Sequence, residues 1–145
     1  MAYVDLNPIR AGIVKELQHS LYTSIKKRLD ELHNSQSDLT RPIKAIAGGV
    51  STQRLNINLS EYIQLIEWAG KSTVHPAKAS MPALINTLLS TMNLQPNNWL
   101  SQINHFNKDS PHSIGCLSNI KKKAESLHKI WIKGVTRSRL MYLKA

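Results

Sequence analysis

The chain has 145 residues, a formal net charge of +10 at pH 7 and a single cysteine. Its length fits one domain, or a tail joined to one modest helical unit, and no apolar run approaches the roughly 18 residues of a membrane span. One cysteine excludes an internal disulfide, so we expect a buried or half-buried thiol at Cys116 and a soluble, cytoplasmic protein without membrane contact.

The positive charge is unevenly distributed. Residues 1–58 contain eight basic and five acidic side chains, residues 59–106 contain two of each, and residues 107–145 contain nine basic and two acidic ones. A basic end beside a neutral stretch is typical of a polyanion-binding surface, most often for nucleic acid. A merely solvated basic surface stays open as the alternative.

The first predicted element is a helix junction in residues 3–14. Asn7 is a good N-cap, and Pro8, with its fixed φ and missing N–H, suits the first turn of a helix. Gly12 then allows the chain to turn after a short helix. Because only two residues precede Tyr3, we expect nothing to fix the helix that carries Tyr3 in place.

The next helix is expected to begin with Ser24 as its cap and to end near residues 33–35, since apolar side chains recur there at helical spacing. Residues 35–58 contain proline, two consecutive glycines and polar punctuation. This composition predicts an irregular linker, with a short extended piece at residues 54–58.

Four helices are expected after the linker. The first has Ser60 as its cap and Gly70 as its stop, and its predicted buried stripe consists of Tyr62, Leu65, Ile66 and Ala69. Pro82 opens an apolar second helix, and Pro96 opens a third that runs to Phe106.

The last predicted helix covers residues 113–133 and ends at Gly134. Beyond it we expect a mobile tail. The apolar spacing along these helices favours a core position for Trp68, Trp99 and Trp131 over a role as nucleobase platforms.

Together these patterns predict a mainly α chain, a small helical bundle of about five helices with an irregular central linker. The expected organisation is a tyrosine helix and its following helix at residues 1–34, the linker at 35–58, and a basic helical extension at 59–145.

The segment Tyr3-Val4-Asp5-Leu6-Asn7-Pro8-Ile9-Arg10-Ala11-Gly12 resembles the Tyr-x-x-x-Asn-Pro-x-Arg-Ala-Gly segment of REP-associated tyrosine transposases, single-tyrosine nickases of the HUH type. Weaker similarities follow in order, at residues 22–28, 59–71, 98–99 and 114–115 and around Trp131. The resemblance therefore covers nearly the whole chain and implies a C-terminal portion that lacks the family's upstream ferredoxin-like catalytic sheet.

The resemblance implies that Tyr3 is the nucleophile that becomes covalently linked to DNA. In the family, two histidines separated by one hydrophobic residue hold Mg or Mn, which polarises the scissile phosphate. No two histidines here are spaced His-x-His; they are His19, His33, His75, His105, His112 and His128. We therefore expect no metal site and no cofactor in this chain, and no cleavage by it alone.

Basic residues are the second candidate site, because phosphate contacts by Lys and Arg supply most non-specific DNA affinity. The candidates in the basic end are Lys121, Lys122, Lys123, Lys129, Lys133, Arg137 and Arg139. The first three fan across roughly 200° of a helix, and Lys129 and Lys133 are expected to extend that face. Arg10 either contacts phosphate or packs the catalytic helix.

The resulting hypothesis is a transposase fragment that binds single-stranded or hairpin DNA, and also a second copy of itself or an intact transposase. The alternative is a standalone helical protein-interaction module or a non-functional remnant.

Overall fold

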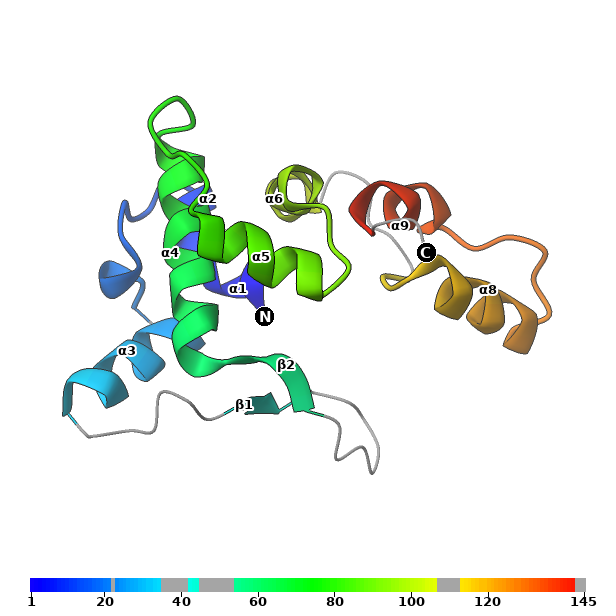
Figure 1. The fold of residues 1–145 in the computed structure, drawn as a ribbon, viewed down its shortest axis with the longest axis horizontal. Helices are drawn as coiled ribbons and strands as arrows, with labels where there is room; N and C mark the ends of the chain where they lie inside the picture. Colours follow the sequence, from blue (N-terminus) through cyan, green and yellow to red (C-terminus); the bar gives the residue numbers. More distant parts are fainter. Residues whose placement is uncertain (22, 35–41, 45–53, 107–112, 143–145) are drawn as a thin grey trace. The chain divides into compact units, whose positions relative to one another are not determined.

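The computed structural model describes residues 1–21, 23–34, 42–44, 54–106 and 113–142. These residues are mainly helical, which confirms the fold class expected from the sequence (Figure 1). The chain divides into two compact units, Met1–Leu88 and Leu89–Ala145. The division into segments 1–34, 35–58 and 59–145 that the sequence suggests stays a prediction. Within the described ranges, no helix combines the length and the apolar character that crossing a bilayer requires.

The first unit contains short N-terminal helices, a pair of strands and one long helix: α1 (Ala2–Asp5), α2 (Asn7–Arg10), the 3₁₀ turn η1 (Leu17–His19), α3 (Ser24–Asn34), β1 (Pro42–Lys44), β2 (Arg54–Asn58) and α4 (Leu59–Val74). Helix α5 (Ala83–Thr91) spans the division, and the second unit holds α6 (Pro96–Asn104), α8 (Leu117–Ser126) and α9 (Val135–Met141). Among the described residues, the five longer helices correspond to the five expected ones, whereas α1, α2 and α9 are too short to leave a periodic signal.

Helix α2 begins at Asn7, so Asn7 is not its N-cap. Leu6 takes that position without a side-chain hydrogen bond, and Pro8 lies in the first turn as predicted. At the other end, Gly12 has φ +70°, and the Ile13 N–H donates to the Pro8 carbonyl at 2.9 Å. This is the long bond of a Schellman ending, and it confirms the turn expected at Gly12.

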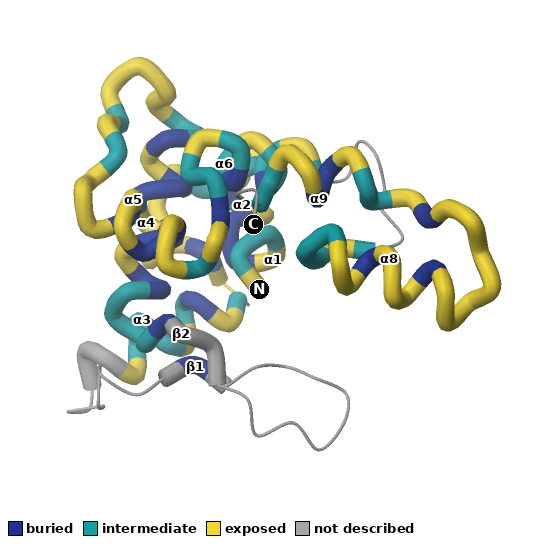
Figure 2. The backbone as a smooth tube through the Cα atoms, turned by 45° about the vertical axis from the view of Figure 1, so that its right-hand side comes forward, coloured by how far each residue is buried: buried dark blue, intermediate teal, exposed yellow. Residues whose placement is uncertain are grey.

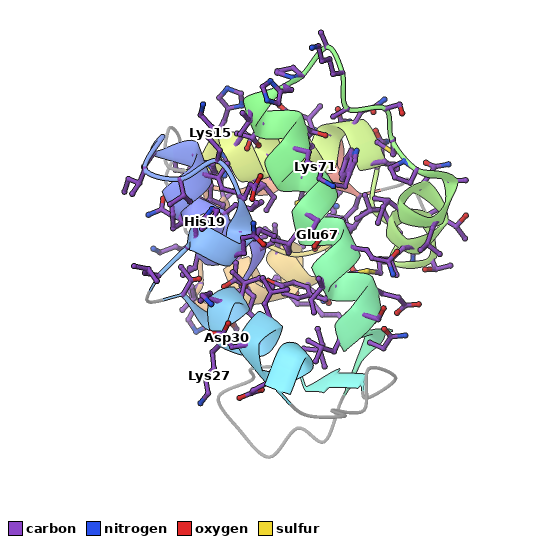
Figure 3. The ribbon with its side chains drawn as sticks, turned by 90° about the vertical axis from the view of Figure 1, so that its left-hand side faces the viewer. Lys15, His19, Lys27, Asp30, Glu67 and Lys71 are labelled. Carbon is purple, nitrogen blue, oxygen red and sulfur yellow. The ribbon has the colours of Figure 1, made fainter. Side chains whose placement is uncertain are left out.

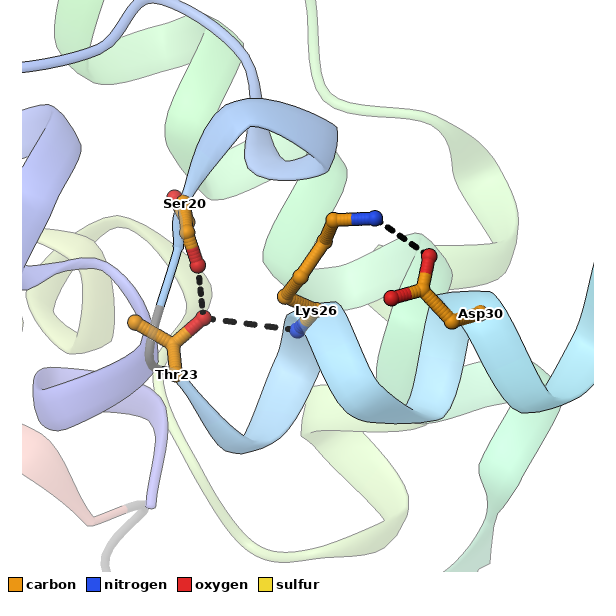
Figure 4. Close-up of polar contacts among 4 residues, drawn as sticks. All are labelled: Ser20, Thr23, Lys26 and Asp30. Carbon is orange, nitrogen blue, oxygen red and sulfur yellow. Dashed lines mark hydrogen bonds and ion pairs between the residues drawn. The ribbon is translucent and has the colours of Figure 1, made fainter.

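The start of α3 is capped by Thr23 rather than by Ser24, which is the first residue of the helix. The Thr23 hydroxyl oxygen accepts from the Lys26 N–H at 3.3 Å and donates to the Ser20 carbonyl at 2.6 Å (Figure 4). One turn on, Lys26 pairs with Asp30. The cap therefore sits one residue earlier than predicted.

Helix α4 begins with a capping box. The Asn58 side chain accepts from the Glu61 N–H at 2.9 Å, and the Glu61 carboxylate accepts from the Asn58 N–H at 2.8 Å. This reciprocal pair makes Asn58 the N-cap, so the expected cap at Ser60 is wrong. Gly70 does not end the helix either, because α4 continues to Val74 with Gly70 buried inside it.

Strands β1 and β2 pair antiparallel, with Pro42 opposite Asn58 and Lys44 opposite Arg54. Strand β2 confirms the extended piece predicted for residues 54–58. The rest of the predicted linker, at residues 35–41 and 45–53, lies outside the described residues.

In the second unit, hydrogen bonds join the start of α6 to the end of α9. Gln95, the N-cap of α6, donates its N–H to the Met141 carbonyl at 2.9 Å. The Asn98 side chain donates to the Leu140 carbonyl at 2.8 Å. Pro96 occupies the first turn of α6, as predicted.

Helix α8 is much shorter than the helix predicted for residues 113–133. It ends at Ser126, and His128 then adopts a left-handed conformation with φ 52°. The Lys129 N–H donates to the Ala124 carbonyl at 2.9 Å, which closes the helix as a Schellman ending. Residues beyond this turn therefore do not extend the face of α8.

Gly134 starts a helix instead of ending one. It has φ +135° and is the N-cap of α9, so the expected mobile tail is wrong. A Cβ at this position would lie 2.2 Å from the Ser113 carbonyl oxygen, which only glycine avoids. Ile132, Ile120 and Ala124 form the core between α8 and α9.

Burial follows the predicted stripe along α4, where all four expected residues are buried (Figure 2). Of the three tryptophans, Trp68 and Trp99 are buried at 7% and 5% exposure, as predicted. Trp131 is 65% exposed, so its predicted core position is wrong.

Candidate functional site

Tyr3 and Arg10, the two N-terminal candidates, lie next to each other. Tyr3 is on α1, and the guanidinium carbon of Arg10, at the end of α2, lies 4.4 Å from the centroid of the tyrosine ring. At this distance the cation and the ring attract each other. Both side chains are half-buried. Arg10 thus packs on the tyrosine, while a contact with phosphate stays a prediction.

Helices α1 and α2, which carry Tyr3 and Arg10, form the tyrosine segment. Asp5 anchors this segment to the rest of the first unit. Its side chain is fully buried, and its Oδ1 accepts from the Ser24 hydroxyl at 2.5 Å and from the Ile25 N–H at 3.2 Å. Its Oδ2 accepts from the Tyr62 hydroxyl of α4. The carboxylate therefore joins α1 to both α3 and α4, and the expectation that nothing fixes the Tyr3 helix is wrong.

Tyr62 is held in its protonated form by this arrangement. Its burial, together with the hydrogen bond to Asp5 and the negative charge of Asp5, raises the pKa of Tyr62 above its ordinary value. The Arg28 guanidinium, 5.4 Å from the ring centroid, opposes this shift without reversing it. Tyr62 consequently remains a hydrogen-bond donor to Asp5 throughout the neutral pH range.

Packing of α2 on α4 supplies the second anchor. Leu6 and Ile9 are buried at 0% and 5% exposure. A Cβ built on Gly70 would lie 2.9 Å from the Ile9 Cδ1, so the glycine leaves room for this side chain. The buried face of the first two helices thus positions Tyr3 on their partly exposed side.

A cavity of about 490 Å³ lies beside the tyrosine segment, between α2, η1, α3 and α4. Its apolar lining includes Ile9, Leu17 and Leu29. Three lysines and three carboxylates surround it: Lys15, Glu16, Lys26, Asp30, Glu67 and Lys71. Figure 3 labels four of them, Lys15, Asp30, Glu67 and Lys71. Because these formal charges cancel, this cavity has no electrostatic preference for a polyanion.

A second cavity, of about 480 Å³, lies along the C-terminal half of α4 and the loop that follows it. Trp68, Lys71, His75, Lys78 and Ile85 contribute to its lining. Its two lysines face only one carboxylate, that of Glu67. It contains none of the residues predicted to act on DNA.

The basic candidates of the second unit are exposed, but they do not share one helix. Lys121, Lys122 and Lys123 are exposed on α8. Lys129 and Lys133 are exposed on the connection to α9 rather than on an extension of α8. The structure thus assigns them to two neighbouring elements of one unit.

The two arginines of α9 differ in their surroundings. Arg137 is buried at 8% exposure, and its guanidinium donates to the carbonyls of Phe106 at 3.3 Å and His105 at 3.4 Å. It also lies 5.7 Å from the centre of the Phe106 ring. Arg139 is exposed. Arg137 therefore ties α9 to the end of α6, while Arg139 is accessible to a ligand.

Cys116, directly before α8, is half-buried as expected. Its Sγ lies 3.2 Å from the Ser118 Oγ, and hydrogen bonding from this turn lowers the pKa of the thiol. The described part of the chain brings together no group of three or more His, Cys, Asp or Glu side chains that suits a metal ion.

A scan against protein-family models, a search among curated proteins and a search among solved structures found no match to this chain.

The sequence reasoning missed two residues of the tyrosine segment's support, Asp5 and Tyr62. Two signals could have indicated them. Asp5 is a single acid between the apolar residues Val4 and Leu6, and Tyr62 lies on a predicted buried stripe, where its hydroxyl needs a partner.

Proposed function

We propose that this chain is the DNA-binding, tyrosine-bearing portion of a transposase related to the REP-associated tyrosine transposases. In this proposal the second unit binds single-stranded or hairpin DNA, and Tyr3 is the residue that becomes linked to the DNA strand. The resemblance of residues 3–12 to the family segment suggests the reaction, and the basic surface supports the substrate class.

The observation that carries the DNA-binding proposal is a group of exposed lysines with little opposing charge. Residues 113–142 contain seven basic side chains and one acidic side chain, Glu125. None of the ion pairs found among the described residues involves the five lysines of this region. Such unneutralised charges are available for phosphate contacts and for the release of counterions from DNA.

The support of Tyr3 fits a role at a reacting centre. A nucleophile must be held still relative to its substrate. The Asp5 hydrogen bonds fix α1, which carries Tyr3, and the buried Ile9 fixes the adjoining α2. The ring itself remains partly accessible beside the cationic Arg10, a side chain suited to a phosphate. These features support the proposed nucleophile without supplying a base for it.

The family resemblance also implies Mg or Mn at the cleavage site. The described residues do not fit such an ion, because they form no suitable ligand group and both Asp5 oxygens already accept hydrogen bonds from protein donors. We therefore assign no step to a metal held by this chain.

A binding titration against hairpin and scrambled single-stranded DNA, at several salt concentrations, tests the proposal. The variant Lys121→Gln/Lys122→Gln/Lys123→Gln should bind more weakly to every sequence. Its salt slope should flatten by about 0.7 for each phosphate of a single strand that the variant no longer binds.

The matched control removes the same number of charges from the first unit. In Lys15→Gln/Lys27→Gln/Lys78→Gln three exposed lysines are neutralised, and the net charge falls from +10 to +7 as it does in the test variant. Equal effects of the two triple variants would show a bulk charge effect, and no effect of either would refute the proposed DNA surface.

Cleavage is tested separately. With hairpin DNA and Mg or Mn, this chain alone should yield no covalent adduct on a denaturing gel. With a catalytic domain that carries the histidine pair added in trans, an adduct should form and Tyr3→Phe should abolish it. An adduct formed by the chain alone would contradict the proposal that its own residues do not suffice for cleavage.

A helical protein-interaction module is the second candidate function. Apolar side chains exposed after α8, at Leu127, Ile130 and Trp131, favour it because large exposed apolar groups often mark interaction sites. A chain that binds no DNA at low salt but associates with itself or another protein would support this alternative.

A further inference from the structure

The segment between α8 and α9 places large apolar side chains in solvent. Ile130 is 107% exposed, Trp131 65% and Leu127 43%. This exposed stretch is visible in Figure 2 as the run that follows α8. Burying an aromatic side chain of this size normally contributes substantially to stability, so its exposure calls for a physical explanation.

The segment is anchored at both ends. On the α8 side, the His128 N–H donates to the Glu125 carbonyl at 2.9 Å and the Lys129 N–H to the Ala124 carbonyl at 2.9 Å. These two bonds form the complete Schellman ending, and they require the left-handed conformation of His128. A non-glycine residue in that conformation costs about 1–2 kcal/mol.

On the α9 side, Ile132 is buried at 6% exposure against the core of α8. The Lys133 carbonyl accepts from the Ser113 N–H at 3.3 Å, and glycine is the only residue type that fits the backbone position of Gly134. The buried Ile132 fixes one end of the connection between α8 and α9, and the Schellman turn fixes the other. Ile130 and Trp131 therefore extend into solvent from a backbone that is held at both ends.

The charges around this connection indicate which kind of ligand it would bind. Lys129 precedes Ile130, Lys133 follows closely after Trp131, and both lysines are exposed. No acidic residue occurs between Glu125 and the end of the described chain at Tyr142. The complementary ligand carries regularly spaced negative charges together with flat apolar groups, and single-stranded nucleic acid has both.

We propose that Trp131 is a base-stacking site for single-stranded DNA, with Lys129 and Lys133 on the flanking phosphates and Ile130 covering the edge of the stacked base. This inference rests on the proposed DNA-binding function. It narrows the substrate to strands with accessible bases, because the bases of a duplex are already stacked on one another. Aromatic stacking of this kind is tolerant of base identity.

The test compares an oligothymidylate with an abasic oligonucleotide of the same length, which has the same phosphates but no bases. The wild-type chain should bind the thymidylate at least about fivefold more tightly. Trp131→Ala should lose this preference while its salt slope stays unchanged, since every phosphate-binding lysine is still present. Trp131→Phe should retain most of the preference, and Trp131→Leu should not.

Tryptophan fluorescence provides a direct readout. Thymidylate should quench the emission of the exposed indole, and Trp131→Phe should abolish the quenching, because Trp68 and Trp99 are buried. Ile130→Ala serves as the control for a reduced apolar surface and should lower the affinity less than Trp131→Ala. All variants should keep the wild-type circular dichroism spectrum, since both side chains are exposed.

The possible failures are distinguishable. Salt-sensitive binding that does not discriminate thymidylate from abasic strands would overturn the stacking site and leave the DNA-binding function standing. Absence of any DNA binding would overturn both. Self-association of the chain, or binding to anionic vesicles, that Trp131→Ala abolishes without changing DNA affinity would assign the exposed side chains to another occupant and refute the proposal.

Discussion

Replacing Asp5 by asparagine should destabilise the first unit by about 3 kcal/mol. The carboxylate accepts three hydrogen bonds, from the Ser24 hydroxyl, the Ile25 N–H and the Tyr62 hydroxyl. A hydrogen bond to a charged group contributes about 1.5–3 kcal/mol. Asparagine keeps one neutral acceptor oxygen but places an NH₂ group where a second acceptor is needed.

The estimate follows from that exchange. The Tyr62 O–H loses its acceptor, and the bonds from Ser24 and Ile25 become bonds to a neutral oxygen. The start of α3 also loses a nearby negative charge worth about 0.3–1 kcal/mol. Because typical domains have unfolding free energies of only about 5–15 kcal/mol, the destabilisation is readily measured. Urea unfolding followed by circular dichroism should show a midpoint lowered by about 1–3 M with an unchanged m value.

Asp30→Asn is the matched control. Asp30 is a half-exposed acid on the surface of α3 that pairs with Lys26, and exposed ion pairs contribute about 0–1 kcal/mol. A destabilisation in Asp5→Asn of less than about 1 kcal/mol, or one no larger than that of Asp30→Asn, would refute the claim that the buried carboxylate fixes the tyrosine segment.

Three further predictions test other parts of the structure. Gly134→Ala should destabilise the chain by at least about 2 kcal/mol, because its Cβ would meet the Ser113 carbonyl oxygen at 2.2 Å; Gly12→Ala, with nothing within 4 Å of the added Cβ, should cost only the left-handed backbone penalty of about 1–2 kcal/mol. His128→Gly should raise the free energy of unfolding by about 1 kcal/mol, since glycine adopts φ 52° without strain; an unchanged or lower urea midpoint would contradict this. Tyr62 should make unfolding pH-dependent above its ordinary pKa of 10.0, because its folded pKa is raised and the unfolded chain loses the proton first. In alkaline urea titrations the stability of the wild type should therefore fall by up to about 1.4 kcal/mol per pH unit more steeply than that of Tyr62→Phe, and parallel curves would exclude this linkage.

The sequence predicted the helices that combine periodic apolar residues with clear breaks. Helix α4 keeps its expected buried stripe because Tyr62, Leu65, Ile66 and Ala69 recur at the helical period. Pro96 marks the start of α6 because proline lacks the N–H that an interior helical position requires. These signals depend only on local physics, and they survive in the folded chain.

Predictions failed where two residues of similar propensity compete or where tertiary contacts decide. Asn58 and Ser60 are both good caps, and the position of Glu61 three residues after Asn58 selects Asn58. Gly70 was interpreted as a stop because glycine often ends helices, whereas here the approach of Ile9 explains it. Apolar residues at helical spacing also continue past α8, and the spacing alone cannot show that Trp131 points into solvent.

The candidate site was predictable in part. Tyr3 and Arg10 were found from a sequence segment, and the lysines were found from local charge. Their support was not, because Asp5 and Tyr62 are 57 positions apart and no local pattern connects them.

That separation has a consequence for the chain during its synthesis. A four-residue helix such as α1 has no stability by itself, and its buried carboxylate finds its last partner only when Tyr62 has left the ribosome. At about 5–20 residues per second, the intervening 57 residues take roughly 3–11 s to translate. For those seconds the nascent segment around Asp5 is exposed to chaperones and proteases, and the emergence of Tyr62 on α4 ends that interval.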